Sequence, residues 1–273
     1  MAKKHPGICA LCGKWDGDLT FEHIPPRSAF NATPAKPVSG IDILAHQTAG
    51  GGARMPWDTA GLQYTNLQKG MGRYCLCQTC NNNTSSWYGD AYVELARAAH
   101  YAIASYSPDD PDGIGFRDVY PLRFIKQVLS FFCSTNPPEN PQLDDLRKFV
   151  LDKYAVGLDK TKYRLCMYFT KSTFMKQTGY MVQLRMTEEG YDTVTLSEIT
   201  AYPFGFILYF DPKNSWGFKG TDITACADFG YDEKCNIELP WRIEEMKDLF
   251  PETFRSREEI IRNREIGMKQ SED

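Results

Sequence analysis

The sequence predicts an α+β fold, with a small N-terminal module followed by a larger domain that contains an antiparallel sheet. Three observations support this prediction. Two Cys-x2-Cys pairs frame the first 80 residues, apolar residues recur at helical spacing between residues 84 and 150, and short aromatic and β-branched runs follow between residues 163 and 230. With 273 residues, of which 42% are apolar, the chain can bury one large core or two modest ones.

The two cysteine pairs predict one metal site. Each pair can form a tight knuckle, and four sulfurs can together surround one tetrahedral zinc ion at about 2.3 Å. Cys75 lacks the two-residue spacing to the last cysteine, and we leave it out of the site. We therefore expect a structural Zn²⁺ bound by Cys9, Cys12, Cys77 and Cys80.

Cysteine usage also indicates the compartment. Nine cysteines, an odd number, argue against a secreted disulfide scaffold, and a reducing compartment favours metal ligation by the paired ones. The longest apolar run, residues 204–210, is far shorter than the roughly 20 residues of a membrane span, and no signal-peptide stretch follows the first lysines. We expect a cytoplasmic protein without membrane contact, in which the scattered cysteines fill core space: Cys133, Cys166, Cys226 and Cys235.

Three elements are expected in the N-terminal module. A strand at residues 19–23 is ended by Pro25 and Pro26, which places His23 at a strand end where its side chain can project into a cleft. Residues 27–76 are rich in turn formers and predict a long loop that carries one short strand or hairpin. Residues 84–106 predict a helix, because capping residues precede apolar positions at three- and four-residue steps.

Residues able to perform chemistry lie beside the cysteines. Glu22 and His23 lie between the two pairs, and Asn81 directly follows the last cysteine. An unperturbed imidazole titrates near 6.5, so a neutral histidine is a usable general base at cellular pH. Carboxylate and amide oxygens are hard ligands that suit Mg²⁺ or Mn²⁺. These residues could therefore place a base beside a second, hard cation.

This arrangement resembles the HNH endonucleases, also called ββα-metal or His-Me finger endonucleases, and especially their zinc-containing members such as the phage junction-resolving endonucleases. The resemblance covers roughly residues 9–105 and implies metal-dependent hydrolysis of nucleic-acid phosphodiester bonds. It implies that His23 is the general base and that Glu22 and Asn81 hold the catalytic Mg²⁺ or Mn²⁺. It also implies that Asn66 orients the histidine, because Asn66-Leu-Gln resembles a family segment that precedes the second knuckle.

Several of these residues have a second interpretation. The family most often has Asp where this chain has Glu22, so either the metal lies farther out, or Glu22 lies behind the ligands and Asn81 works with one of residues 82–84. Asn81 is also a plausible helix cap, and Asn66 an ordinary turn residue. Arg27 either contacts a phosphate or is a plain surface arginine.

The second half begins at a break in the pattern, and we place the domain boundary in the Asp-, Pro- and Gly-rich residues 109–115. This gives a zinc-containing nuclease domain over residues 1–108 and an α+β domain over residues 109–273. Helices are expected from Pro121 and from Pro141, and a charged helical tail from about Trp241. Strands are expected at residues 163–169, 181–186, 193–199, 204–210 and 223–229.

Charge and architecture suggest the partners. The net charge is −4, but residues 1–100 hold nine Lys and Arg against seven Asp and Glu, so a nucleic-acid surface belongs on the N-terminal part. Double-stranded DNA is the expected substrate, with RNA as an alternative. The acidic second half resembles no family and is expected to form homo-oligomers or to bind a regulatory protein.

The joining of an HNH module to an unfamiliar domain resembles prokaryotic restriction or anti-phage defence effectors, an analogy of architecture only. The alternative function is that of a catalytically inactive zinc ribbon that binds nucleic acid or protein.

Overall fold

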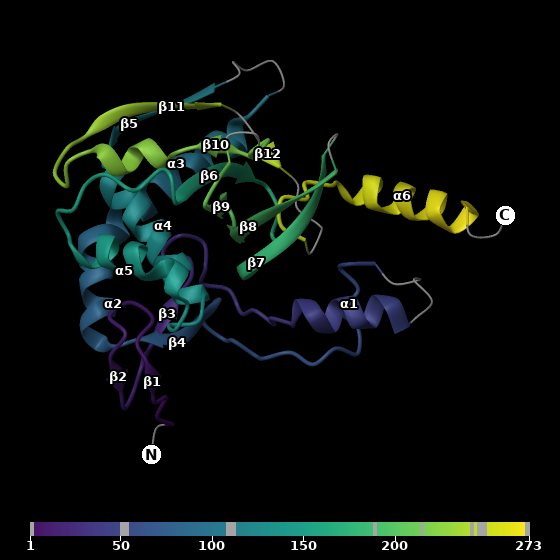
Figure 1. Cartoon of the computed structure of the whole chain (residues 1–273), viewed down its shortest axis with the longest axis horizontal. Helices are drawn as coiled ribbons and strands as arrows, with labels where there is room; N and C mark the ends of the chain where they lie inside the picture. Colours follow the sequence, from purple (N-terminus) through teal and green to yellow (C-terminus); the bar gives the residue numbers. More distant parts are fainter. Residues whose placement is uncertain are drawn as a thin grey trace.

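The computed structural model describes residues 3–49, 55–107, 113–187, 190–213, 216–240, 243–244 and 250–270. These residues form helices and mostly antiparallel sheets, which confirms the predicted α+β class (Figure 1). Among them, every helix is too short or too polar to cross a membrane.

The N-terminal module contains two short antiparallel pairs of strands. Strands β1 (Gly7–Ile8) and β2 (Trp15–Asp16) form a hairpin around the first cysteine pair, and Gly13 between them adopts a φ of +69°, which glycine tolerates best. Strand β3 (Thr20–His23) pairs antiparallel with β4 (Gly72–Leu76), which confirms the predicted strand and its end at His23.

The helix that follows β4 begins earlier than predicted. It runs through α2 (Gln78–Thr84), a π-helical turn η1 (Ser85–Gly89) and α3 (Asp90–Ser105), without a break between them. Cys77 has extended geometry and immediately precedes the first turn, so the second knuckle itself starts the helix. As a result Cys80 and Asn81 are helical residues. Asn81 lies inside α2, and the helix-cap interpretation of this residue is therefore wrong.

The segment predicted as a long loop contains more structure than expected. Besides β4 it has helix α1 (Gly40–Ala49) and an isolated bridge between Ala35 and Leu67. Among the α1 residues whose side chains are described, only Ile43 is buried, so the sequence has no apolar stripe to announce the helix. The glycine-rich residues 50–52 lie outside the described part of the chain.

The helices of the second half agree with the prediction. Helix α4 (Pro121–Thr135) begins with a proline in its first turn, and every residue of it except Arg123 is buried. Helix α5 (Asp144–Leu151) follows the short 3₁₀ helix η2 (Pro141–Leu143), which Asn140 caps through its side chain. Two strands that were not predicted as a pair, β5 (Gly113–Val119) and β11 (Cys235–Pro240), form a separate antiparallel ribbon.

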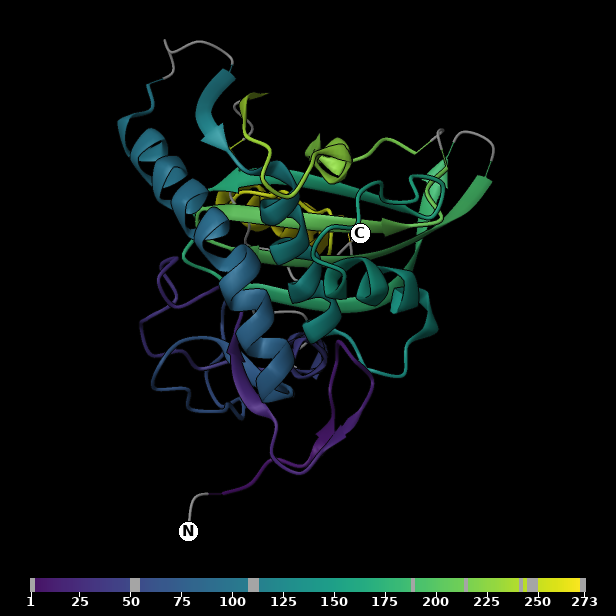
Figure 2. The same cartoon turned by 90° about the vertical axis from the view of Figure 1, so that its left-hand side faces the viewer.

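The main sheet has the strand order β10-β6-β9-β8-β7, and β12 (Ile243–Glu244) pairs in parallel with β6. Its long strands are β6 (Tyr163–Thr170), β7 (Lys176–Thr187), β8 (Gly190–Ala201) and β9 (Phe204–Phe210), which confirms four of the predicted strands. The blue and teal helices lie across one face of this sheet (Figure 2). Aromatic rings fill the layer between them, where Tyr92 and Phe124 contact Phe204.

Two predictions for the C-terminal part are wrong. The strand expected at 223–229 is instead the 3₁₀ helix η3 (Thr224–Asp228), preceded by the short strand β10 (Thr221–Asp222). The main-chain and hydroxyl donors of Thr224 both bond to the Asp222 carboxylate, and this turns the chain out of the sheet.

The tail is also not helical from Trp241, which itself lies outside the described residues. Ile243–Glu244 form strand β12, and the helix α6 (Arg257–Gln270) starts only after a reciprocal capping box between Ser256 and Glu259.

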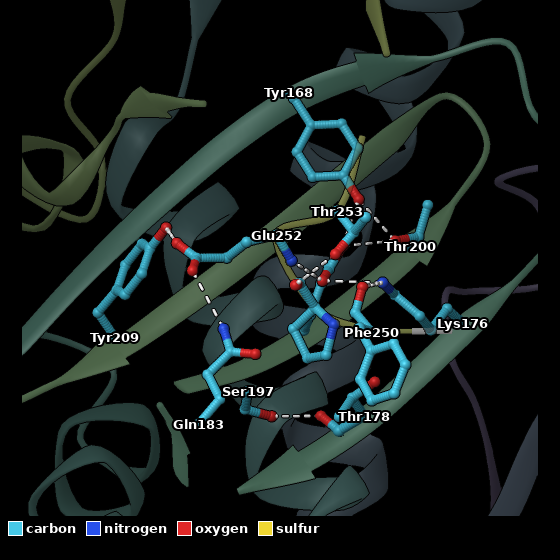
Figure 3. A network of polar contacts seen from close by, with 12 residues as sticks. Tyr168, Lys176, Thr178, Gln183, Ser197, Thr200, Tyr209, Phe250, Glu252 and Thr253 are labelled. Atoms are coloured by element: carbon cyan, nitrogen blue, oxygen red, sulfur yellow. Dashed lines mark hydrogen bonds and ion pairs between the residues drawn. The ribbon is translucent and has the colours of Figure 1, made fainter. Parts of the chain in front are cut away.

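A buried polar network fixes the chain before α6 to the other face of the sheet (Figure 3). The Glu198 carboxylate forms a 2.9 Å ion pair with Lys176 and accepts hydrogen bonds from the Tyr168 hydroxyl and the Glu252 main-chain N–H. The Glu252 carboxylate in turn accepts from Tyr209. We call these five residues the Glu198 network. It attaches the segment around Glu252 to four strands of the sheet, β6, β7, β8 and β9.

The two halves share a core. The predicted boundary, residues 109–115, lies partly outside the described residues and partly in strand β5, and one buried apolar cluster includes residues on both sides of it. Arg147 of α5 donates a 3.0 Å hydrogen bond to the Ala10 carbonyl inside the first knuckle. Gln177 of β7 donates to the Ile24 carbonyl, directly after His23. The second half therefore supports the loops that carry the candidate site.

Candidate functional site

The two cysteine pairs come together as predicted. The sulfurs of Cys9, Cys12, Cys77 and Cys80 all lie within 4.8 Å of one another. The Cys12 and Cys77 sulfurs are 3.9 Å apart, close to the edge of about 3.8 Å expected for a tetrahedron with 2.3 Å bonds. Within the described ranges, this is the one group of three or more His, Cys, Asp or Glu ligands close enough to hold a metal. The cluster could hold a metal such as zinc.

The surroundings of the cluster favour a negatively charged sulfur at Cys9, whereas the pKa of Cys12 is raised by burial and that of Cys80 by its hydrogen bond with Cys9. A hydrogen bond with Cys80 and main-chain N–H groups, including that of Cys77, lower the pKa of Cys9 to about 4. Cys75 is buried outside the cluster, and burial raises the pKa of its thiol to about 12. The structure therefore agrees with the prediction that Cys75 is not a ligand of the metal. Of the scattered cysteines, Cys133 and Cys166 are fully buried.

A cavity of about 530 Å³ lies beside the cluster and contains three of the predicted site residues. Glu22, His23 and Asn81 all line it. The remaining wall comes from the loop after β3, from the helix α2–η1–α3 and from α4. This volume is within the range of roughly 300–1,000 Å³ that is usual for small-molecule sites.

Glu22 is a buried carboxyl group without a protein partner. Its exposed fraction is 9%, and among the described residues its side chain has neither a hydrogen bond nor an ion pair. Because burial removes water from the carboxylate, it raises the pKa of Glu22 to about 8. A bound cation would compensate this cost.

His23 is oriented as a neutral base. Its Nε2 lies 3.1 Å from the Lys69 carbonyl. A carbonyl can only accept, so Nε2 carries the proton and Nδ1 keeps its lone pair when the ring is neutral. Burial, followed by the nearby charges of Arg27 and Lys69, lowers the pKa of His23 below its ordinary value. The Phe21 ring contacts the imidazole edge-on and restricts it further.

Asn81 presents its amide oxygen. Its Nδ2 donates a 2.8 Å hydrogen bond to the Thr20 hydroxyl, and that hydroxyl donates its own proton to the Leu76 carbonyl. Because the hydroxyl proton is already used, Thr20 can only accept from Asn81, and this fixes the amide orientation. The Oδ1 atom of Asn81 has no hydrogen-bond partner among the described residues, so it remains available as a ligand.

Asn66 does not join these residues. It is exposed, it does not line the cavity, and its Oδ1 accepts a 2.8 Å hydrogen bond from Gln68. The contact that we expected it to make with His23 is made by the Lys69 main-chain carbonyl. A carbonyl belongs to every residue, so side-chain identity could not have revealed it. Arg27 does line the cavity, with an exposed side chain.

Sequence reasoning missed two parts of the cavity wall, one from the helix beyond Asn81 and one from helix α4 of the second half. Ser85, Gly89 and Asp90 line it from the π-helical turn and the start of α3, and Gln127 lines it from α4. In the sequence, Gln127 is one polar residue in an apolar helix, with no nearby motif to single it out. π-helical turns often occur at functional sites, but a sequence pattern does not announce them.

Comparison with known proteins gives no family for this chain. No protein-family model, no curated protein and no solved structure matches it.

Proposed function

We propose that this protein is a metal-dependent endonuclease of the HNH type that hydrolyses nucleic-acid phosphodiester bonds. The observation that carries the proposal is that Glu22, His23 and Asn81 line one cavity directly beside the four-cysteine cluster. A zinc ribbon needs only the cysteines. A buried carboxylate, a neutral imidazole and an oriented amide oxygen in one cavity are the parts that phosphodiester hydrolysis requires.

In this proposal His23 accepts the proton of the attacking water on Nδ1 while Nε2 stays bonded to the Lys69 carbonyl. The Glu22 carboxylate and the Asn81 Oδ1 are hard oxygen ligands that no described residue binds, which fits Mg²⁺ or Mn²⁺. Such a cation supplies stabilisation of the charge that develops on the phosphate and the leaving oxygen. The exposed Arg27 guanidinium at the cavity can pair with a phosphate of the substrate.

The cysteine cluster has a positioning role in this proposal. We propose zinc as its metal, because four thiolates in tetrahedral spacing suit Zn²⁺. Asn81 is covalently next to Cys80, and its amide is bonded to Thr20 of β3, the strand that ends in His23. The cluster thus joins the helix of one catalytic residue to the strand of another without contacting substrate.

We keep double-stranded DNA as the proposed substrate, a reducing cytoplasmic location, and a role for the acidic second half in self-association or regulator binding. Restriction or anti-phage defence is the biological setting that the architecture suggests. RNA as substrate is the alternative, and competition between single- and double-stranded DNA and RNA would distinguish them.

Plasmid nicking tests the proposal. Wild-type protein in Mg²⁺ or Mn²⁺ should convert supercoiled plasmid to open circles, and His23→Ala should lower the rate by roughly 10²- to 10⁴-fold, the usual contribution of a general base. His46→Ala is the matched control, because His46 on α1 does not line the cavity. Equal activity of wild type and His23→Ala, or none in either across metals and substrates, would favour the binding module instead.

A further inference from the structure

Gln127 is a buried amide whose orientation is fixed. Its exposed fraction is 2%, and its Nε2 donates a 3.1 Å hydrogen bond to the Ser130 hydroxyl. That hydroxyl donates its only proton to the Gln127 main-chain carbonyl at 2.7 Å. Ser130 can therefore only accept from the amide, so the nitrogen must point toward Ser130 and the oxygen away from it.

The amide oxygen of Gln127 is buried in the wall of the cavity, with no hydrogen-bond partner among the described residues. Gln127 lines the same cavity as Glu22. Gly89 lies next to this oxygen, because a Cβ atom built there would stand 3.9 Å from it and 3.8 Å from the Ser85 hydroxyl. The absence of a side chain at Gly89 leaves that space open. A buried acceptor without a donor is costly and points to a missing ligand.

The chemistry of the wall indicates what that ligand is. Asn81 Oδ1 and Gln127 Oε1 are acceptor oxygens, the Glu22 carboxylate becomes one when a cation displaces its proton, and none of the three has a hydrogen-bond partner among the described residues. A phosphate oxygen is also an acceptor and would be repelled by them. A hard divalent cation satisfies several such oxygens at once, and amide oxygens are ordinary ligands for it.

We infer that Gln127 is a ligand of the divalent cation in this cavity, contributed by helix α4 of the second half. This inference rests on the proposed function for the presence of the cation. It also offers an explanation for Glu22 in place of the shorter Asp: the coordination sphere includes a residue from outside the ββα module, so the cation is not held by β3 and α2 alone.

Direct Mn²⁺ binding tests the inference without depending on catalysis. Full-length protein that retains the metal of its cysteine cluster would be titrated with Mn²⁺ and followed by electron paramagnetic resonance. Gln127→Met keeps the length of the side chain but offers no hard ligand, and it should weaken Mn²⁺ binding about tenfold or more. Gln127→Glu keeps an oxygen and adds charge, and it should bind Mn²⁺ at least as tightly as wild type.

Thermal unfolding adds a readout that a purely structural role would not give. Gln127→Met removes a buried acceptor that has no partner among the described residues, so without Mn²⁺ the Tm of this variant should be no lower than that of wild type. When Mn²⁺ is added, the variant should lose most of the rise in Tm that wild type shows. Ser134→Ala is the matched control, because the Ser134 hydroxyl is also buried on α4 but lies beside Cys75 and does not line the cavity. It should leave Mn²⁺ binding unchanged.

The outcomes separate this inference from the proposed function. Wild-type Mn²⁺ affinity in Gln127→Met would overturn the inference and leave the nuclease proposal standing if nicking persists. Weakening by Gln127→Met that Gln127→Glu does not restore would also overturn it, because the oxygen would then not be the feature that matters. If the wild-type protein neither binds Mn²⁺ nor nicks DNA, both proposals fail together.

Discussion

Two buried carboxylates in this chain, Glu22 and Glu198, have opposite surroundings. Glu198 is fully buried in the sheet and is paired with Lys176, the Tyr168 hydroxyl and a main-chain N–H. Glu22 is almost as buried, yet its carboxyl group forms no hydrogen bond or ion pair with the described residues, and Arg73 opposite it on β4 bonds to Thr135 and Gln177 instead. The protein itself supplies the partners of the Glu198 network, and Figure 3 shows four of its residues, Tyr168, Lys176, Tyr209 and Glu252. The cavity around Glu22 is completed only by something that binds there.

This contrast separates structural from functional polar groups. A buried group whose partners are all supplied by the protein stabilises one arrangement of the chain. A buried group without partners lowers stability and is retained where a ligand uses it. Burial alone therefore does not distinguish a structural carboxylate from a functional one. The presence or absence of protein partners does.

The largest effect is expected from loss of a ligand in the cysteine cluster. Cys80→Ser should release the bound metal and unfold the N-terminal module, because the binding energy of a structural metal is folding energy. Metal content by mass spectrometry and circular dichroism would measure both effects. Cys75→Ala is the control, since Cys75 is a buried neighbour outside the cluster. Full metal content in Cys80→Ser would contradict the assignment.

Effects of intermediate size are expected in the two carboxylate regions, on stability in one and on Mn²⁺ binding in the other. Lys176→Met leaves Glu198 with an unpaired buried charge and should lower the free energy of unfolding by about 3–5 kcal/mol. Glu22→Gln removes no protein contact, so it should change that free energy by less than about 1 kcal/mol. It should nevertheless weaken Mn²⁺ binding about tenfold or more.

Urea unfolding and Mn²⁺ titration of both variants would measure this division. Lys148→Met is the control for lysine removal, because the Lys148 side chain is exposed on α5 and should change stability by less than about 0.5 kcal/mol. Equal destabilisation by Glu22→Gln and Lys176→Met would show that Glu22 has a structural role after all.

The smallest effect is expected at Asn66. Asn66→Ala removes an exposed side chain that bonds only to Gln68, so stability should change by less than about 0.5 kcal/mol. The nicking rate should stay at the wild-type level, because the Lys69 carbonyl still holds His23. Rate measurements beside His23→Ala would check this. A loss comparable to that of His23→Ala would restore the role that the family resemblance implies for Asn66.

Local patterns were sufficient to predict much of the fold. The spacing of the cysteine pairs predicted the cluster, the double proline predicted the end of β3 at His23, and periodicity predicted α4 and the long strands. Helix α1 was not predicted, because Ile43 is the one buried residue among its described side chains and the sequence therefore shows almost no helical spacing of apolar residues. Helix α6 was placed too early because its capping box at Ser256 was not recognised.

The candidate site was predictable only where its residues are near one another in the sequence or beside the cysteines. Glu22, His23 and Asn81 meet that condition. Gln127 does not, because it reaches the cavity through the packing of α4 on the π-helical turn. The Lys69 carbonyl does not either, because a main-chain group has no signature in the sequence. Long-range packing and main-chain contacts cannot be predicted from the pattern of side chains in the sequence.

Arg147 places a constraint on how this protein can change over evolutionary time. Its guanidinium holds the Ala10 carbonyl between the first two cysteines from a helix more than a hundred residues downstream. A gene rearrangement that joined the cysteine-bearing segment to a different C-terminal part would separate the loop from its anchor. The two halves should therefore be inherited together, and neither can be grafted elsewhere as an independent building block.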